Sequence, residues 1–396
     1  MELWKKNLLV CWFGCFATAA GLSQIAPILP LYIDHLGIHD LGEIEQWSGI
    51  AFGVTFIIMA IASPIWGQAA DRYGRKPMLL RASLGMAIVI TCMGFVQNIY
   101  QLVALRLIQG AVSGFVSAAI TLIATQAPRD RAGWALGTLS TGAVGGMLLG
   151  PLIGGYLAET WGLHSVFFGT GTLLVIAFMA SLLFVEEDFK PPTKKVLSFR
   201  EVWSSIPNPG IMITMFVTTF ILQLALLSIE PIITVYITEL HVTNHVVLIS
   251  GMVFAASGFG NMLAASHLGK ISDRIGPQKV MLVALLAAGL LFIPQAFVTD
   301  PWQLMGLRFL LGIAAAGLLP SINTLIMRNT PNSITGRAFG FNQSAQFLGS
   351  FAGSLLGGQI AATFGIHYVF FVTGTLLIIN AVWVYTTVCK QVALQQ

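Results

Sequence analysis

The chain has 396 residues, of which 56% are hydrophobic and only 9% are charged, and its formal net charge is +4. Soluble domains carry about 25% charged residues, so this composition excludes a soluble fold and makes lipid the solvent. The apolar segments are about twice as long as the strands of a membrane barrel and lack strict alternation, which excludes a porin. The small positive charge gives no reason to expect a nucleic-acid partner.

Apolar segments long enough to cross a bilayer, about 20 residues each, recur along the whole chain. In chain order they are 8–33, 46–68, 78–97, 101–126, 134–158, 163–185, 211–237, 247–268, 279–298, 302–327, 338–363 and 366–389. Lys5 and Lys6 precede a first segment without a small-residue cleavage site, so we expect it to remain as the first helix. The sequence therefore predicts an all-α polytopic membrane protein with 12 transmembrane helices.

Positive charge is confined to one face of this expected helix array. Eighteen of the 20 Lys and Arg lie at the chain ends or in the connections of that face, whereas the opposite connections, such as 34–45 and 238–246, contain none. The positive-inside rule makes the basic face cytoplasmic, with both termini inside. A polar, proline-containing stretch divides the chain, and we expect a six-helix bundle at 1–185, a cytoplasmic linker at 186–209 and a second bundle at 210–396.

The two halves of the chain are repeats of one another. Residues 67–76 are echoed at 269–279, and residues 162–168 recur almost unchanged at 365–371. The shared register runs through six helices, an even number, so both halves enter the membrane from the same side. We therefore expect two bundles related by an axis along the membrane normal, with a cavity between them, which is the plan of a transporter.

A charged turn follows the second expected helix. Its pattern Gly-x-x-x-Asp-Arg-x-Gly-Arg-Lys is supplied by Gly67, Asp71, Arg72, Gly74, Arg75 and Lys76. The second copy keeps Asp273 and Arg274 but has Pro-Gln in place of Arg-Lys. We expect Gly67 to allow close helix approach, Gly74 to allow a tight turn, and Asp71 to lie near the N-terminus of the eleventh helix. These charges predict a cytoplasmic gate; the alternative is a merely solvated basic loop.

Two further motifs lie inside expected helices. Arg106 is in the fourth helix, where a charge costs several kcal/mol unless it is paired or wetted; the alternative is a side chain that snorkels to the outer interface. We expect a structural role for its repeat counterpart Arg308. The fifth helix carries Gly-x-x-x-Gly-Pro-x-x-Gly-Gly, formed by Gly146, Gly150, Pro151, Gly154 and Gly155. Glycines at this spacing make a flat packing face, and the proline bends the helix.

Glu230 is an acid deep in the seventh expected helix. A carboxyl group in an apolar cavity can take up and release a proton near neutral pH, and it attracts cations. Glu230 is therefore the main candidate for proton coupling, assisted by Arg106, and helical periodicity places Gln223 on its face. A structural partner for Arg106 is the alternative. Asp34 is a weaker coupling candidate, with a solvated surface carboxylate as its alternative.

Neutral polar residues on the expected helices are candidates for the substrate cavity, although a packing hydrogen bond is an equal alternative for each of them. They are Gln24, Gln223, Asn323, Gln343 and Gln346. No phosphate-binding loop is present, so transport must use an ion gradient or run downhill. The four Cys and seven His show no ligand spacing, so we expect no metal and no cofactor other than protons as the coupling ion.

Together and in this order, the turn, the helix 4 motif and the helix 5 motif resemble those of the major facilitator superfamily. The match is to its twelve-helix drug:proton antiporters of the bacterial cytoplasmic membrane, and residues 134–142 resemble the multidrug-exporter branch that contains MdtG and PmrA. The resemblance implies efflux of lipophilic, often cationic drugs in exchange for protons, by rocking of two bundles. It also implies that Arg106 serves coupling and that the 67–76 turn stabilises the outward-facing state.

Other functions remain open at this point. A dedicated exporter of a single metabolite, such as a sugar or siderophore, fits the same motifs. A membrane enzyme or sensor would need catalytic clusters or an output domain, and the sequence shows neither. The expected partners are small lipophilic substrates, protons and membrane lipid, and we expect a monomer.

Overall fold

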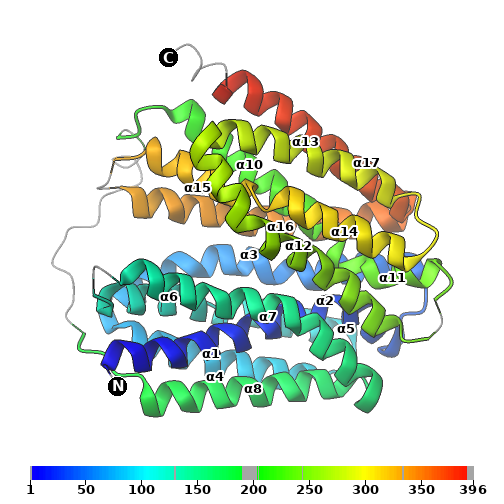
Figure 1. Ribbon diagram of the computed structural model, residues 1–396. Coiled ribbons are helices and arrows are strands. Elements are labelled where there is room, and N and C mark those ends of the chain that lie inside the picture. The colour runs from blue at the N-terminus through cyan, green and yellow to red at the C-terminus, as the bar shows by residue number, and fades with distance from the viewer. Residues whose placement is uncertain are drawn as a thin grey trace. The chain divides into compact units, whose positions relative to one another are not determined.

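The computed structural model describes residues 2–128, 131–189, 203, 205–242, 244–331 and 334–389, apart from the side chains of Ser266, Asp273 and Cys389. Every regular element in these residues is helical (Figure 1). Eleven of the helical segments are long and apolar enough to cross a membrane, and a pair bent by 42° brings the total to twelve if it is counted as one span. The expected all-α polytopic class is confirmed.

The first half of the chain contains six spans built from eight helices. They are α1 (Leu3–Ser23), α2 (Ile25–His35), α3 (Leu41–Tyr73), α4 (Arg75–Met93), α5 (Ile99–Val112), α6 (Phe115–Gln126), α7 (Ala132–Trp161) and α8 (Leu163–Phe184). The pairs α1–α2 and α5–α6 each form one broken span, so two of the six expected helices are interrupted.

The second half repeats this order. Its elements are α10 (Pro209–Leu227), η1 (Glu230–Ile232), α11 (Ile233–Glu239), α12 (Val246–Ile275), α13 (Pro277–Gln295), α14 (Pro301–Ala315), α15 (Leu318–Arg328), α16 (Thr335–Phe364), α17 (Ile366–Val384) and η2 (Tyr385–Cys389). The interrupted spans are again the first, α10–η1–α11, and the fourth, α14–α15.

Local sequence explains where several helices begin. The side chain of Asn98 accepts a hydrogen bond from the helix at the start of α5, and Asp300 does the same at the start of α14. Gly74, between α3 and α4, and Gly276, between α12 and α13, have φ of 96° and 97°. Residues with a side chain rarely adopt this left-handed backbone conformation, so glycine is needed at both sharp turns of the chain.

The chain folds into two compact units. Unit 1 comprises Met1–Asp40, Ile50–Thr193 and Val242–Ala255, and unit 2 comprises Leu41–Gly49, Lys194–His241 and Ala256–Gln396. Within unit 1, α1 packs along α7 and α4 packs along α8 (Figure 1). Within unit 2, the repeat-related pairs α10–α16 and α13–α17 pack in the same way.

Individual hydrogen bonds are repeated as well. In unit 1 the hydroxyl of Tyr32 donates to the carbonyl oxygen of Met93 over 2.6 Å. In unit 2 the hydroxyl of Tyr236 donates to the carbonyl oxygen of Gln295 over 2.7 Å. All four residues occupy corresponding positions in the two halves, so the duplication seen in the sequence extends to buried polar contacts.

Candidate functional site

Two membrane spans of each half are interrupted, and several polar side chains lie at or near these breaks. Spans 1 and 4 of each half are interrupted, at Gln24 and at residues 113–114 in the first half, and at residues 228–232 and 316–317 in the second. Irregular backbone at membrane depth is tolerated only where protein or a water-filled cavity satisfies it. The sequence indicated continuous spans here, so these interruptions were not predicted.

Glu230 lies in one of these breaks. It opens the 3₁₀ turn η1 between α10 and α11, and it is partly exposed although the flanking Ile229 and Pro231 are buried. The helical register that would place Gln223 on the same face does not run through this break. The carboxyl group is therefore held by a turn, with apolar neighbours on both sides and a route to solvent.

Arg308 supplies the charge that acts on Glu230 within unit 2. It lies on α14 and is 3% exposed, and its Nε and Nη2 atoms have no hydrogen-bond partner among the described residues. A buried guanidinium without acceptors is costly, so an acid nearby compensates it strongly. The sequence favoured a structural role for Arg308, and its electrostatic interaction with Glu230 was not predicted.

Arg106 has the opposite surroundings in unit 1. Its side chain is 0% exposed, Nε donates to the carbonyl oxygen of Ala51 over 2.9 Å, and Nη1 donates to Gln109 Oε1 over 2.8 Å. Its guanidinium also lies 5.2 Å from the ring centroid of Phe52. Arg106 therefore ties α5 to α3 and does not snorkel to an interface. Its expected part in proton coupling is a prediction that this geometry leaves open.

A partly buried arginine, Arg81, bonds to the backbone at the break between α5 and α6. Arg81 Nη2 donates to the carbonyl oxygen of Ser113 over 2.8 Å, and its guanidinium lies 3.6 Å from the ring centroid of Trp66. Trp66 Nε1 in turn donates to the carbonyl oxygen of Ala111 over 2.6 Å. In the sequence, Arg81 is one of the 18 basic residues of the expected cytoplasmic face, and nothing there shows that the helix breaks beside it.

The glycine face of α7 packs directly on α1. A Cβ atom at Gly146 would overlap the carbonyl oxygen of Phe16, and one at Gly150 would overlap Ser23. Cβ atoms at Gly154 and Gly155 would also lie closer than 3.1 Å to a neighbouring atom. The second half builds the same face on α16. There, Cβ atoms at Gly349, Gly353 and Gly357 would overlap the backbone of α10. Close packing thus explains the glycines of both halves, and Pro151 alone is particular to the first.

The charged turn is organised by an acid that sequence analysis missed. Arg75 Nη2 donates to Asp71 Oδ1 over 2.7 Å within the turn. Glu187, three residues after α8, accepts from the backbone N–H of Arg75 and of Lys76 over 2.7–2.8 Å. Glu187 therefore caps the N-terminus of α4, while the expected position of Asp71 near the eleventh helix stays a prediction. Its only sequence signal is its position in an acidic run just beyond a span.

The remaining residues of the turn are less constrained. Among the described residues, nothing lies within 4 Å of a Cβ built on Gly67, and the close helix approach expected there stays a prediction. Arg72 is exposed and lies over the ring of Tyr73, and Arg274 in the second copy is also exposed. Asp273 lies in α12, and its side chain is outside the described residues.

The candidate cavity residues fall into both units. In unit 1, Gln24 is buried and its amide donates to Thr170, while Asp34 is exposed and accepts from His39 Nδ1 over 2.8 Å. Unit 2 holds the other four together with Glu230 and Arg308. These are Gln223 and Asn323, both partly buried, and Gln343 and Gln346, whose amides bond to each other over 3.2 Å.

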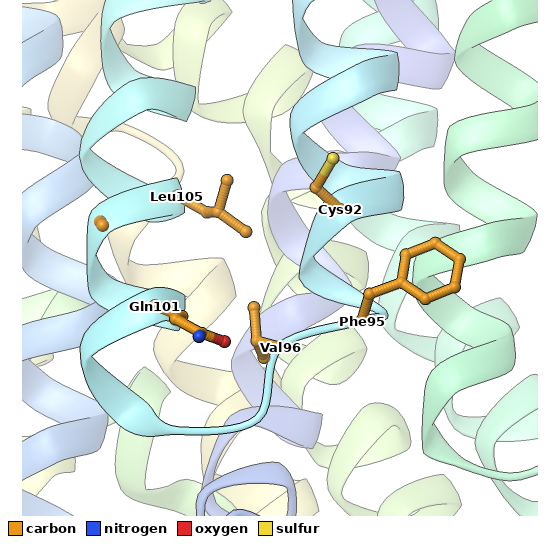
Figure 2. Close-up of a pocket in the computed structure, with 6 residues that line it drawn as sticks. Cys92, Phe95, Val96, Gln101 and Leu105 are labelled. Carbon is orange, nitrogen blue, oxygen red and sulfur yellow. The ribbon is translucent and has the colours of Figure 1, made fainter.

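A separate groove lies at one end of α4 and α5 (Figure 2). It is lined by Cys92, Phe95, Val96, Gln101, Ala104 and Leu105. Its one amide side chain, Gln101, already accepts from the backbone N–H of Gln97 over 2.9 Å. The groove therefore offers a mainly apolar surface.

Comparisons with known proteins agree with this architecture. The Major Facilitator Superfamily model matches residues 11–293 and 215–389. The Multidrug resistance protein MdtG of Salmonella arizonae is 49% identical over 391 residues, which cover 98% of this chain and 96% of that protein. The MdtG protein of Citrobacter koseri is similar at the same identity and coverage.

Solved structures show the same fold at low identity. The nucleoside transporter NupG superposes with a TM-score of 0.78 at 14% identity, over 98% of this chain and 99% of that one. A bacterial homologue of the human lysosomal transporter Spinster gives 0.79 at 14% identity, over 98% and 97%. Multiple spans and relatives of this kind make the chain a multi-pass protein of the bacterial inner membrane. The chain belongs to the Major Facilitator Superfamily.

Proposed function

We propose that this transporter exports lipophilic, cationic compounds in exchange for protons by alternating access. The relatives named multidrug resistance proteins, at 49% identity over nearly the whole chain, support a multidrug substrate range. Support for the energetics comes from one observation. A partly exposed carboxyl group sits in the broken seventh span, within the electrostatic reach of a buried arginine that has unsatisfied donors.

Exchange follows when two ligands compete for one carboxylate. A proton or a cationic substrate can neutralise Glu230, but a substrate cation and a proton cannot both do so. When neither is bound, the charge of Arg308 compensates the carboxylate, so the empty site is not an isolated buried charge. Arg308 thereby sets how strongly the carboxylate attracts a cation. Strict antiport also requires that the transporter change state only when a proton or a substrate is bound.

The charged turn serves as the cytoplasmic gate in this proposal. Its first copy consists of Asp71, Arg72, Gly74, Arg75 and Lys76, and Asp273 and Arg274 belong to the second copy in unit 2. The Asp71–Arg75 ion pair and the backbone bonds of Glu187 hold the turn in one conformation. We therefore expect the ion pair and the Glu187 bonds to break together if the turn changes conformation when the transporter switches between states.

Glu230→Gln tests the coupling. The variant keeps the size and polarity of the side chain but cannot exchange a proton. In proteoliposomes, substrate-driven proton release is expected to fall at least tenfold, whereas exchange of labelled for unlabelled substrate persists if the substrate site survives. Asp34→Asn tests the weaker coupling candidate in the same assay. The Asp34 carboxylate is exposed and bonds only to His39 among the described residues, so full proton release is expected from this variant. Full proton release by Glu230→Gln would overturn the assignment.

Substrate breadth needs a separate measurement. A panel of cationic, neutral and anionic dyes and drugs in an efflux-deficient strain is expected to show protection mainly against the cations. Protection against one compound only would favour the dedicated metabolite exporter instead. Glu230→Gln is expected to reduce protection against cations more than against neutral compounds, since only cations gain from the carboxylate charge.

A further inference from the structure

Two histidine side chains converge at the end of α2 in unit 1. His35 is the last residue of α2, and His164 lies in the first turn of α8, 129 residues later. Their Nε2 atoms are 3.4 Å apart, with ring centroids 5.3 Å apart and ring planes at 78°. His35 is exposed and His164 is partly exposed, so solutes can reach the point where the rings meet.

The tautomer of His164 is fixed by the backbone. Its Nδ1 atom lies 2.8 Å from the carbonyl oxygen of Gly94, and a carbonyl oxygen can only accept, so Nδ1 carries the proton. The neutral ring therefore directs the lone pair of Nε2 at His35. Tyr32 packs edge-on against the ring at a centroid distance of 5.6 Å and fixes its orientation. Histidines that ligate metals usually donate from their other nitrogen in this way.

The separation of the two nitrogens fits a shared metal ion. A distance of 3.4 Å is long for a direct hydrogen bond between rings. Two Zn–N bonds of about 2.0–2.1 Å at a tetrahedral angle place the nitrogens about 3.3 Å apart. We propose that the His35–His164 pair binds a divalent transition-metal ion of the Zn²⁺, Cu²⁺ or Ni²⁺ class, which imidazole ligands favour.

The site is a two-ligand site completed by water. No group of three or more His, Cys, Asp or Glu in the described part of the chain is arranged to hold a metal. The sequence indicated no metal because the two ligands lie 129 residues apart and meet only when α2 packs near α8. An ion bound there joins the segment beyond the break at Gln24 to α8. This proposal does not depend on the proposed transport reaction.

The second half provides a natural comparison. His367 corresponds to His164, its Nδ1 lies 2.7 Å from the carbonyl oxygen of Ala296, and Tyr236 packs on it at 5.6 Å. Glu239 occupies the position of His35, and its charge interacts with that of His367. Unit 2 therefore has the same oriented imidazole with a carboxylate in place of the second imidazole, which is a poorer ligand pair for Cu²⁺ and Ni²⁺.

Direct metal titration tests the pair. Full-length protein in detergent, with any histidine tag removed, is titrated with Zn²⁺ against a chromogenic chelator and with Cu²⁺ under electron paramagnetic resonance. We expect one ion per chain and nitrogen splitting from two imidazoles. His35→Ala and His164→Ala are each expected to weaken binding at least tenfold. His39→Ala and His367→Ala are the controls and are expected to leave binding unchanged.

A gain of binding tests the geometry itself. Glu239→His gives unit 2 the arrangement of unit 1, so a second ion per chain is expected. Metal-free thermal unfolding of each variant verifies that it is folded. Absence of binding by the wild-type protein at a tenfold molar excess of Zn²⁺, or binding that survives in the His35→Ala/His164→Ala double variant, overturns the proposal. Failure of Glu239→His to bind a second ion overturns the claim that two converging imidazoles suffice.

Discussion

Arg106 and Arg308 occupy the same position in the two repeats, yet only one of them is satisfied. Arg106 is fully bonded, and one of its acceptors is Gln109. The residue corresponding to Gln109 in the second half is Leu311, and Arg308 has two donors without partners among the described residues. The acid also differs, because the counterpart of Glu230 in the first half is Ala26. The second half thus has an acid where the first half has Ala26, and it lacks the acceptor Gln109. Arg308 is therefore available to interact with Glu230.

Replacing each arginine in turn tests whether the two side chains have different roles. Arg106→Leu deletes hydrogen bonds from a buried cation, and we expect it to lower the free energy of unfolding by about 3 kcal/mol. Arg308→Leu removes a cation with two unbonded nitrogens among the described residues, so its stability loss is expected to be smaller than that of Arg106→Leu, while proton-coupled transport falls at least tenfold. Thermal unfolding in detergent and transport in proteoliposomes measure the two effects. Equal stability losses in both variants would contradict the comparison.

Exchanging the residues at positions 109 and 311 tests whether the acceptor accounts for the difference between the two arginines. Leu311→Gln gives Arg308 the acceptor that Arg106 has, so this variant is expected to be at least as stable as the wild type but to transport more slowly. Gln109→Leu removes the acceptor from Arg106 and is expected to destabilise by about 1.5–3 kcal/mol, as loss of a hydrogen bond to a charged group does. Faster or unchanged transport by Leu311→Gln would show that Arg308 does not act on Glu230.

The two halves pack alike at the glycine faces of α7 and α16, and alanine substitutions test this similarity. Cβ atoms at the repeat mates Gly146 and Gly349 would overlap the carbonyl oxygens of Phe16 and Phe220. Alanine at either position is therefore expected to cost about 1–3 kcal/mol of stability by forcing two helices apart. Gly145→Ala is the control, since its nearest neighbour would be 3.7 Å away, and it is expected to be neutral or stabilising. A cost confined to the first half would mean that this motif has a role beyond packing.

The sequence predicted what depends on period and composition, and missed what depends on tertiary neighbours. Twelve spans and the glycine face of α7 follow from runs and spacing that each helix carries by itself. The breaks at Gln24 and Glu230 were not predicted, because apolar residues continue through them and proline is tolerated in membrane helices. Glu187 was missed because its partners are backbone N–H groups, which every sequence has. Arg308 lacks an acceptor at position 311, where Leu311 is the counterpart of Gln109. This difference is apparent only when the contacts of the two repeats are compared.

The smallest expected effect concerns the turn that only the first half retains in full. Glu187 bonds to the backbone N–H groups at the start of α4, so Glu187→Ala is expected to cost about 1 kcal/mol, as loss of a helix cap does. The neighbouring Glu186→Ala is the control, because in the described part of the chain its exposed carboxylate pairs only with Lys6, and a surface ion pair contributes less. If the turn is the gate, Glu187→Ala also alters the transport rate beyond what its stability loss explains, whereas Glu186→Ala does not. Equal transport by the two variants would show that the Glu187 cap stabilises unit 1 without controlling the gate.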